Sequence, residues 1–157
     1  MPKKTNFKIV LVAPEIPGNT GSIGRTCVAL NIPLILIKPY GFDLSEKAVR
    51  RAGLDYWKFL DLTEYDCIDQ FMASEKPAKE QLCFFSKNAE KTYFEANFVQ
   101  NSFLIFGSET KGLPSELFGS YPERFLSVPM LSDKVRSLNL SNVATAVAYE
   151  TYRQLSL

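Results

Sequence analysis

The sequence predicts an α/β fold, a single domain with a mainly parallel sheet flanked by helices. Five short apolar runs are typical of strands buried on both faces, and helical segments separate most of them. This alternation favours strand–helix–strand units, which produce parallel sheets. With 157 residues, 46% of them hydrophobic, the chain can bury one core, so we expect one domain over residues 1–157.

The expected elements follow one another along the chain. Apolar runs bounded by polar, glycine or proline residues predict strands at 9–13, 34–37, 82–85, 103–106 and 125–128. Capping residues and helical spacing predict helices at 20–30, at 45–52 with Ser45 as N-cap, at 66–74 with Asp66 as N-cap, after Pro114, and at 139–155.

The last of these helices carries apolar side chains around most of its circumference. One apolar face normally suffices for packing against a sheet. A second burying surface is therefore needed, and we expect another copy of the chain to supply it in a homodimer. The alternative is a helix that lies deep in the core of a monomer.

Composition excludes several classes of protein. The chain has no histidine, which removes mechanisms that depend on imidazole, such as Ser-His-Asp triads and HExxH zinc hydrolases. Cys27, Cys67 and Cys83 show no CxxC spacing, so we expect three buried, reduced thiols and no metal site. No apolar run reaches the length of a signal peptide or a membrane span, which favours a cytoplasmic protein without a membrane partner.

Charge is unevenly distributed although the formal net charge is only +1. Residues 1–58 carry nine Lys or Arg against four acidic residues, a balance of +5, whereas the remainder carries nine against thirteen. A polyanion would therefore be attracted to the amino-terminal third of the chain.

The segment VAPEIPGNTGSIGRT is expected to leave a strand and to open a helix. Gly18, Gly21 and Gly24 would free backbone N–H groups for a phosphate at the helix start, with Arg25 one turn further in. The spacing breaks the Walker A pattern, and GxxGxxG differs from the GxGxxG of dinucleotide-binding folds. A nucleotide-binding NTPase built on 18–26 and an ordinary glycine-rich turn both stay open at this point.

Two later segments also have features that suit a ligand. The strand expected at 103–106 runs directly into Gly107, which would place a backbone without a side chain at the carboxyl edge of the sheet, where α/β proteins bind ligands. The loop after Pro129 holds more capping side chains than one helix needs, which suggests a loop ordered around a ligand. An ordinary strand-end turn and a solvated polar loop are the alternatives.

Together and in this order, the three segments resemble the signature motifs of the SPOUT methyltransferases. The matching patterns are Asn19-x-Gly21-x-x-x-Arg25, then FGSETKGLP, then VPM followed by SLNLSN. The likeness covers residues 8–155, and the minimal architecture with PEIP and RRAGLDY is similar to that of the bacterial tRNA (cytidine/uridine-34) 2′-O-methyltransferases. The resemblance implies a carboxyl-terminal trefoil knot, which periodicity alone does not suggest.

The resemblance implies S-adenosylmethionine as the cofactor, with no metal. It assigns the contacts of the cofactor to positions at strand ends and in the following loop, namely Phe85, Gly107, Val128, Met130, Ser137 and Leu138. It assigns the catalytic positions to Arg25, Glu109, Ser137 and Asn139. We expect Arg25 to stabilise the developing oxyanion and not to act as a base, because a guanidinium group does not release its proton under ordinary conditions.

For the partner, the resemblance implies a tRNA anticodon stem-loop bound by a homodimer, with methylation at wobble position 34 of leucine tRNAs. The expected RNA-binding residues combine motif positions with basic residues of the amino-terminal third, namely Asn19, Arg25, Lys47, Arg50, Arg51 and Tyr149. Tyr149 could reach the site of the partner or only pack at the interface. A catalytically idle RNA-binding relative and the NTPase are the alternative functions.

Overall fold

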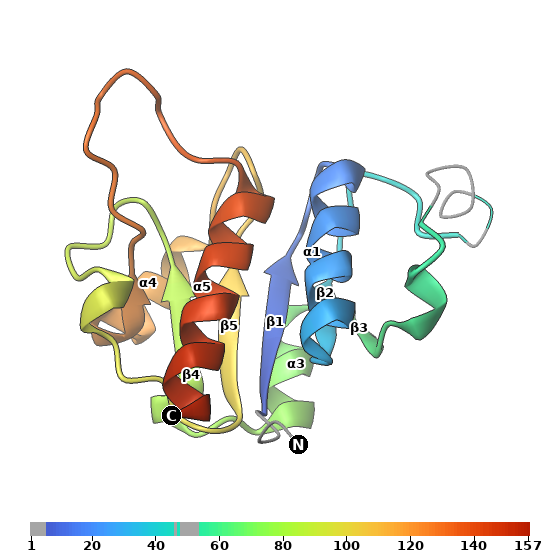
Figure 1. Ribbon diagram of the computed structural model, residues 1–157, viewed down its shortest axis with the longest axis horizontal. Coiled ribbons are helices and arrows are strands. Elements are labelled where there is room, and N and C mark those ends of the chain that lie inside the picture. The colour runs from blue at the N-terminus through green and yellow to red at the C-terminus, as the bar shows by residue number, and fades with distance from the viewer. Residues whose placement is uncertain (1–5, 46, 48–53) are drawn as a thin grey trace.

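Six strands form one sheet in the described part of the chain, which is residues 6–45, 47 and 54–157 of a computed structural model (Figure 1). Across the sheet the order is β3 (Leu62–Tyr65), β2 (Leu34–Ile37), β1 (Phe7–Val12), β5 (Ser102–Phe106), β4 (Leu82–Phe85) and β6 (Phe125–Leu126). Each neighbouring pair is parallel, so the predicted parallel α/β sheet is confirmed.

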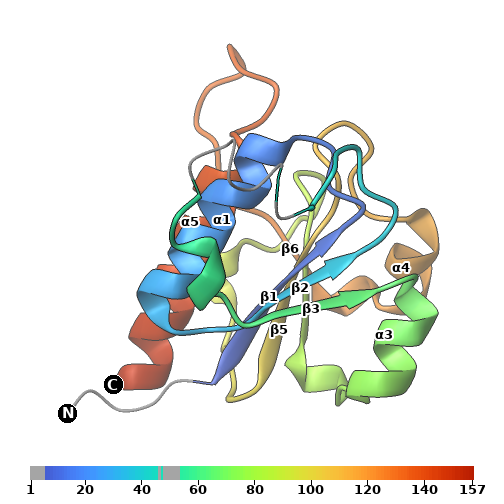
Figure 2. The same ribbon diagram turned by 90° about the vertical axis from the view of Figure 1, so that its right-hand side faces the viewer.

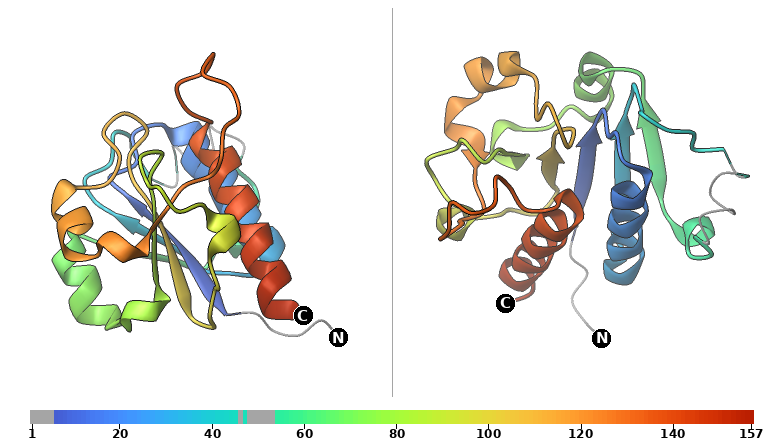
Figure 3. Two further views of the ribbon diagram at one scale, coloured as in Figure 1. Left: turned by 90° about the vertical axis from the view of Figure 1, so that its left-hand side faces the viewer. Right: turned by 90° about the horizontal axis from the view of Figure 1, so that it is seen from above.

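Helices cover both faces of this sheet. Helices α1 (Pro17–Leu30) and α5 (Leu140–Ser156) lie side by side on one face, and a hydrogen bond of 2.8 Å joins Thr26 Oγ1 to Thr145 Oγ1 (Figures 1 and 3). Helices α3 (Ile68–Glu75) and α4 (Ser115–Ser120) cover the other face. Because every strand ends at the same edge, the loops after the strands gather above that edge (Figure 2).

The two faces have separate cores, and β1 contributes to both. Ile9 and Leu11 pack in the cluster that faces α1 and α5, whereas Val10 and Val12 pack in the cluster that faces α3 and α4. Successive side chains of a strand point to opposite faces, so a continuous apolar run is what a strand in this position requires. The apolar runs in the sequence were therefore a sound guide to the central strands.

Strand β3 is absent from the sequence-based expectations. Its sequence, LTEY, contains no apolar run, and its residues are only half-buried or exposed. It lies at the edge of the sheet beside β2, so one side of its backbone has no neighbouring strand. An edge strand of this kind is held by backbone pairing more than by burial, and the hydrophobic pattern does not predict it.

Several predicted boundaries are wrong by a few residues. Helix α1 begins at Pro17 and not at residue 20, because proline fits the first turn of a helix. The N-cap of α3 is Cys67 and not Asp66. Strand β6 ends at Leu126, because the N–H of Ser127 bonds instead to the carbonyl of Lys91. The helix predicted at 45–52 lies outside the described residues, apart from Ser45 and Lys47.

After β6 the chain runs against the loop that follows β4. Ser127 N donates to Lys91 O over 2.9 Å, and Tyr93 N donates to Ser127 O over 2.9 Å. Farther on, the side chain of Gln154 on α5 bonds the backbone of Ala96 and of Phe98. A trefoil knot needs contacts between these segments, and the knotted path itself stays a prediction.

Helix α5 buries more of its surface within a single chain than the sequence suggests. Ala144, Val147, Ala148 and Leu155 are all buried, and these residues pack in the core on the α1 side of the sheet. The outward face retains only two apolar side chains besides polar ones, and it comprises Asn142, Ala146, Tyr149 and Arg153. The prediction of a helix that is apolar nearly all round is therefore only partly correct.

Two further expectations concern cysteines and membranes. Cys27 and Cys83 are buried, but Cys67 is exposed at the start of α3, so the prediction of three buried thiols is wrong for Cys67. Among the described helices, none has the length and the apolar character that crossing a membrane requires.

Candidate functional site

The carboxyl ends of β5, β4 and β6 bring three predicted cofactor residues together. Phe85 is paired with Phe106 on β5 and with Leu126 on β6, so Gly107 and Val128 follow at the same edge. The rings of Phe85 and Phe106 stack with 4.7 Å between centroids, which closes the core beneath this edge. The structure thus places residues that are far apart in the sequence beside one another, as the motifs predict.

Gly107 is required by its own loop. A Cβ atom at this position would lie 2.1 Å from the carbonyl carbon of Gly112 and 2.3 Å from the backbone nitrogen of Leu113. The loop turns back here, because Ser108 and Gly112 exchange backbone hydrogen bonds of 3.3 and 3.0 Å. The returning loop thus requires glycine at position 107, and a backbone contact of Gly107 with a ligand stays a prediction.

Glu109 joins this loop to the segment that opens α1. Its Oε1 accepts a hydrogen bond of 3.0 Å from the N–H of Glu15, and its Oε2 accepts one of 2.6 Å from the N–H of Ile16. In return, Glu15 Oε1 accepts from the hydroxyl of Thr110 over 2.6 Å. These bonds cross from β1 to β5, where the strand order reverses and where open α/β sheets bind ligands.

The hydrogen bonds of Glu15 act on its own ionisation as well. The side chain of Thr110, followed by that of Ser108, lowers the pKa of the Glu15 carboxyl group below its ordinary value. Glu15 is therefore ionised at neutral pH. This suits a carboxylate that accepts hydrogen bonds from both the backbone N–H and the hydroxyl group of Thr110. The sequence motifs point to Glu109 but indicate no role for Glu15 or Thr110, although PEIP is one of the family-like patterns.

Asn139 connects the third segment to the other two. Its Oδ1 accepts from the N–H of Ser141 over 2.9 Å and thereby caps α5. Its Nδ2 donates to Oδ1 of Asn19 over 3.0 Å, and Asn19 Nδ2 in turn lies 3.4 Å from Glu109 Oε2. One polar chain, Asn139–Asn19–Glu109, thus links the starts of α5 and α1 to the loop after β5.

This chain also bears on the predicted phosphate site at the start of α1. Gly18, Gly21 and Gly24 lie within the helix and not in a turn before it. The backbone N–H groups at the helix entrance, those of Glu15 and Ile16, already donate to the carboxylate of Glu109. A carboxylate is favourable at a helix N-terminus for the same reason as a phosphate. The anion that occupies this position is therefore part of the protein, which disfavours the NTPase.

The glycines of α1 serve instead to admit a neighbouring segment. A Cβ at Gly24 would lie 2.6 Å from the ring of Trp57, and one at Gly21 would lie 3.3 Å from the side chain of Leu54. Tyr56 from the same segment donates its hydroxyl hydrogen to the carbonyl of Gly21 over 2.8 Å. Gly21 and Gly24 thus allow close packing against α1, whereas a Cβ at Gly18 would meet nothing within 4 Å.

Arg25 lies on the exposed side of α1, eight residues after Pro17. At 1.5 Å per residue this places it about 12 Å along the axis, just over two turns from the helix start and not one turn as predicted. Its guanidinium carbon lies 5.6 Å from the centroid of the Tyr56 ring. Within this chain, Arg25 therefore lies about two helical turns away from the carboxyl edge that holds Gly107.

The loop before α5 stands away from the body of the protein. Residues 131–139 are all exposed, and they form the arch above the sheet in Figure 1. Ser137 and Leu138 lie in this arch, whereas Val128 and Met130 at its base are half-buried. Leu131 is fully exposed, at 103% of its reference area, so nothing within the described chain covers it.

The predicted RNA-binding residues have separate positions. Lys47 is exposed, and Tyr149 is 48% exposed on the outward face of α5. Asn19 is buried at 8% exposure and holds the polar chain described above, which fits a structural role better than contact with RNA. Arg50 and Arg51 lie outside the described residues, so their role stays a prediction.

The two buried thiols, Cys27 and Cys83, are poor candidates for chemistry. Burial raises the pKa of the Cys27 thiol to about 12, and burial also raises that of Cys83. A thiol with a raised pKa remains protonated and is a weak nucleophile at neutral pH. Among the described residues, no group of three or more Cys, Asp or Glu side chains is arranged to hold a metal ion.

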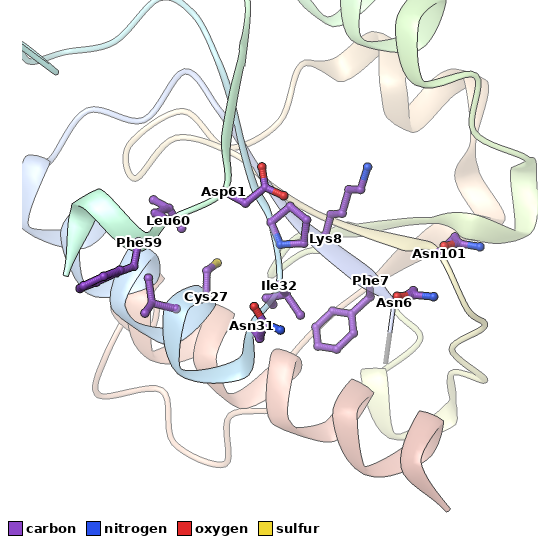
Figure 4. A pocket seen from close by; sticks show the side chains of 12 residues that line it. Asn6, Phe7, Lys8, Cys27, Asn31, Ile32, Phe59, Leu60, Asp61 and Asn101 are labelled. Carbon is purple, nitrogen blue, oxygen red and sulfur yellow. The ribbon is translucent and has the colours of Figure 1, made fainter. Parts of the chain in front are cut away.

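A pocket of about 500 Å³ lies near the amino-terminal ends of the strands, opposite the carboxyl edge of the sheet (Figure 4). Its walls come from the start of β1, the end of α1 and the segment 59–61, and they include Phe7, Cys27 and Asn31. The side chain of Lys8 points away from it and forms an ion pair with Glu75. None of the predicted site residues lines this pocket, which separates it from the carboxyl-edge site.

Comparison with known proteins places this arrangement in a family. The SpoU rRNA Methylase family matches residues 6–149, which contain all three motif segments. The chain belongs to this family. Among similar proteins, the tRNA (cytidine(34)-2′-O)-methyltransferase of Burkholderia cenocepacia is 41% identical over 149 residues, which are 94% of this chain and 95% of that protein.

Solved structures of the family have the same fold. One described as "Structural insights into the 2-OH methylation of C/U34 on tRNA" has a TM-score of 0.87 at 41% identity, covering 96% of this chain and 97% of that one. The SpoU methyltransferase AviRb from Streptomyces viridochromogenes, in complex with the cofactor AdoMet, has a TM-score of 0.78 at 27% identity. That match covers 98% of this chain and 59% of AviRb. The predicted SPOUT fold is confirmed.

Proposed function

We propose that this protein transfers a methyl group from S-adenosylmethionine to the ribose 2′-oxygen at position 34 of tRNA, on cytidine or modified uridine. The observation that carries this proposal is the polar chain Asn139–Asn19–Glu109, which unites the three family segments at the carboxyl edge of the sheet. The names of similar proteins of nearly equal length support the substrate. We propose that the reaction takes place in the cytoplasm, where tRNA is found.

The described residues at the carboxyl edge fit S-adenosylmethionine. Val128 and Met130 are half-buried apolar side chains in the segment after β6, and Val128 packs against the core cluster that contains Phe85 and Phe106. Such a surface suits an adenine ring. The exposed arch 131–139 offers main-chain and hydroxyl groups, including Ser137, that can close over the rest of the cofactor. The role of Ser137 as a catalytic residue, and that of Leu138 as a cofactor contact, remain part of this proposal.

When bound, S-adenosylmethionine supplies an electrophilic methyl group on a sulfonium centre. The task of the protein is to hold the 2′-oxygen in line and to lower the cost of removing its proton. Arg25 would bind the developing oxyanion or the adjacent phosphate through its fixed charge. Glu109 and Asn139 would hold the loop after β5 and the start of α5 in fixed positions relative to α1.

A homodimer would complete the site. Arg25 and Tyr149 are exposed on the adjacent helices α1 and α5, about two turns away from the cofactor edge of their own protomer. Ala146 and Tyr149 give this face an apolar centre, and Leu131 and Val135 in the arch are further apolar side chains with no cover. A two-fold pairing of these helices would bring Arg25 of one protomer toward the cofactor edge of its partner.

Light scattering at micromolar concentration should therefore give twice 17.7 kDa. Ala146→Arg should shift the protein toward monomer, because a charge would be forced into the centre of the interface. Ala73→Arg, on the exposed side of α3 on the opposite face of the sheet, is the matched control and should leave the mass unchanged. A sharp monomer for the unaltered protein would refute the dimer and every role of Tyr149 across it.

The substrate assignment rests on chemistry as well as on names. A protein of this size can recognise a single-stranded loop, whose bases are splayed and whose 2′-hydroxyl is accessible. The anticodon loop has these properties, and the basic residues of the amino-terminal third, including Lys47, would contact its phosphates. Leucine tRNAs are the subset that we propose.

Nucleoside mass spectrometry of tRNA from cells with and without the gene tests this assignment. We expect the loss of 2′-O-methylation at position 34 of leucine tRNAs, and its return when purified protein and S-adenosylmethionine are added to the undermethylated tRNA. Loss of a methyl group at another site instead would retain the reaction class and refute the substrate. Tight tRNA binding with no transfer in a single turnover would identify a catalytically idle relative.

A further inference from the structure

Arg25 is an exposed side chain that has a specific neighbour. Its guanidinium carbon lies 5.6 Å from the centre of the Tyr56 ring, within the range of a cation–π interaction. Among the described residues, no carboxylate forms an ion pair with Arg25. The ring of Tyr56 is thus the partner that the structure provides for this charge.

Tyr56 is itself held firmly on α1. Its hydroxyl donates to the carbonyl of Gly21 over 2.8 Å, one turn before Arg25. Gly21 has no side chain, and a Cβ there would lie 3.7 Å from the Tyr56 hydroxyl and 3.3 Å from Leu54. On the next turn, Gly24 admits the ring of Trp57 in the same way. The segment carrying Tyr56 therefore sits at a fixed distance from the helix.

An aromatic ring is a suitable support for an arginine that must act on an oxyanion. A carboxylate partner would use the N–H donors of the guanidinium group and cancel its charge. A ring face attracts the cation while leaving most of its donors available. It also restricts a flexible side chain, so that less conformational entropy is lost when the substrate binds.

We infer that Tyr56 is a positioning residue, which holds the guanidinium group of Arg25 in the orientation needed at the reacting 2′-oxygen. The inference rests on the proposed function. It predicts that the face of the ring matters and that the hydroxyl group contributes less, since the hydroxyl only anchors the ring to Gly21.

Kinetics with three replacements at one position test the electrostatic part of this role. Tyr56→Phe keeps the ring and should keep kcat within about twofold, whereas Tyr56→Leu should lower kcat roughly two- to fivefold or more, as expected for an exposed cation–π pair. Replacement of Tyr56 by pentafluorophenylalanine retains the shape of Phe but reverses the charge distribution of the ring, and it should match Tyr56→Leu. Phe59→Leu removes another cation–π pair, with Lys58, from the same segment and should leave kcat unchanged.

Two further measurements separate positioning from a merely structural role. In an Arg25→Ala background, Tyr56→Leu should cause no additional loss of kcat, because it acts only through Arg25. With Arg25 in place and without substrate, the NMR chemical shift of the Arg25 Nε–H group should change in Tyr56→Leu. It should not change in Phe59→Leu. Affinity for S-adenosylmethionine should be unchanged in Tyr56→Phe, whereas its melting temperature should fall slightly, because the hydrogen bond to Gly21 is lost.

Failure of the inference can be distinguished from failure of the proposed function. If the unaltered protein does not methylate tRNA, the proposed function fails, and the NMR result still tests the contact. If the unaltered protein is active and the pentafluorophenylalanine variant is as active as Tyr56→Phe, the inference is overturned. Additive losses for Tyr56→Leu and Arg25→Ala would overturn it as well.

Discussion

Arg25→Ala should lower kcat for tRNA methylation by about 10²-fold or more while leaving the affinity for S-adenosylmethionine unchanged. The expected size is that of removing one preorganised charge from a reacting oxyanion. The affinity for the cofactor should not change, because Arg25 lies two turns from the edge of its own chain that holds Gly107, and in the proposed dimer it acts on the reacting oxyanion at the partner's site and not on the cofactor. The fold and the free energy of unfolding should be preserved, because the Arg25 side chain is exposed and contacts the Tyr56 ring by a cation–π interaction.

Calorimetry with S-adenosylmethionine and single-turnover kinetics with saturating tRNA measure the two quantities separately. Arg25→Lys is a useful companion, because it keeps the charge but loses the planar fork of donors. We expect it to recover only part of the rate. Equal losses in cofactor affinity and rate for Arg25→Ala would make Arg25 a cofactor-binding or structural residue and would remove it from the chemistry.

Glu109→Gln should reduce the free energy of unfolding by about 1–3 kcal/mol, the usual worth of a hydrogen bond to a charged group. Both carboxylate oxygens are used, because Oε1 accepts from Glu15 N and Oε2 accepts from Ile16 N and from Asn19 Nδ2. An amide of the same size retains one acceptor, loses the charge that favours the start of α1, and turns a donor toward an N–H group.

Urea denaturation compares this variant with Glu90→Gln, which alters an exposed carboxylate in the loop after β4 and should be neutral. The rate of methyl transfer should fall more than the loss of folded protein accounts for, because Asn19 and Asn139 lose their alignment together with Glu109. A Glu109→Gln protein that is as stable as Glu90→Gln but inactive would instead assign Glu109 a direct part in the reaction.

Local sequence determined the elements whose residues carry their own signals. The strands predicted at 34–37 and 82–85 have these bounds in the structure, because four apolar residues bounded by proline or polar neighbours suit inner strands that are buried on both faces. Helix α5 starts within one residue of the helix predicted at 139–155, and its N-cap, Asn139, is one of several capping side chains that the sequence offers there. The order of the motif segments was also enough to predict the family, because motifs are read along the chain.

The tertiary structure alone decided which residues meet. Glu109 contacts partners 90 to 94 positions earlier in the chain, and Asn139 contacts one 120 positions earlier, so no local pattern could predict these pairs. Gly107 and Gly24 were singled out for a ligand, but only the structure shows that the returning loop, at Gly112 and Leu113, and the ring of Trp57 require the absence of a side chain at these positions. Propensity and periodicity report how a residue suits its own element, whereas these contacts form only after parallel pairing has brought every strand end to one edge.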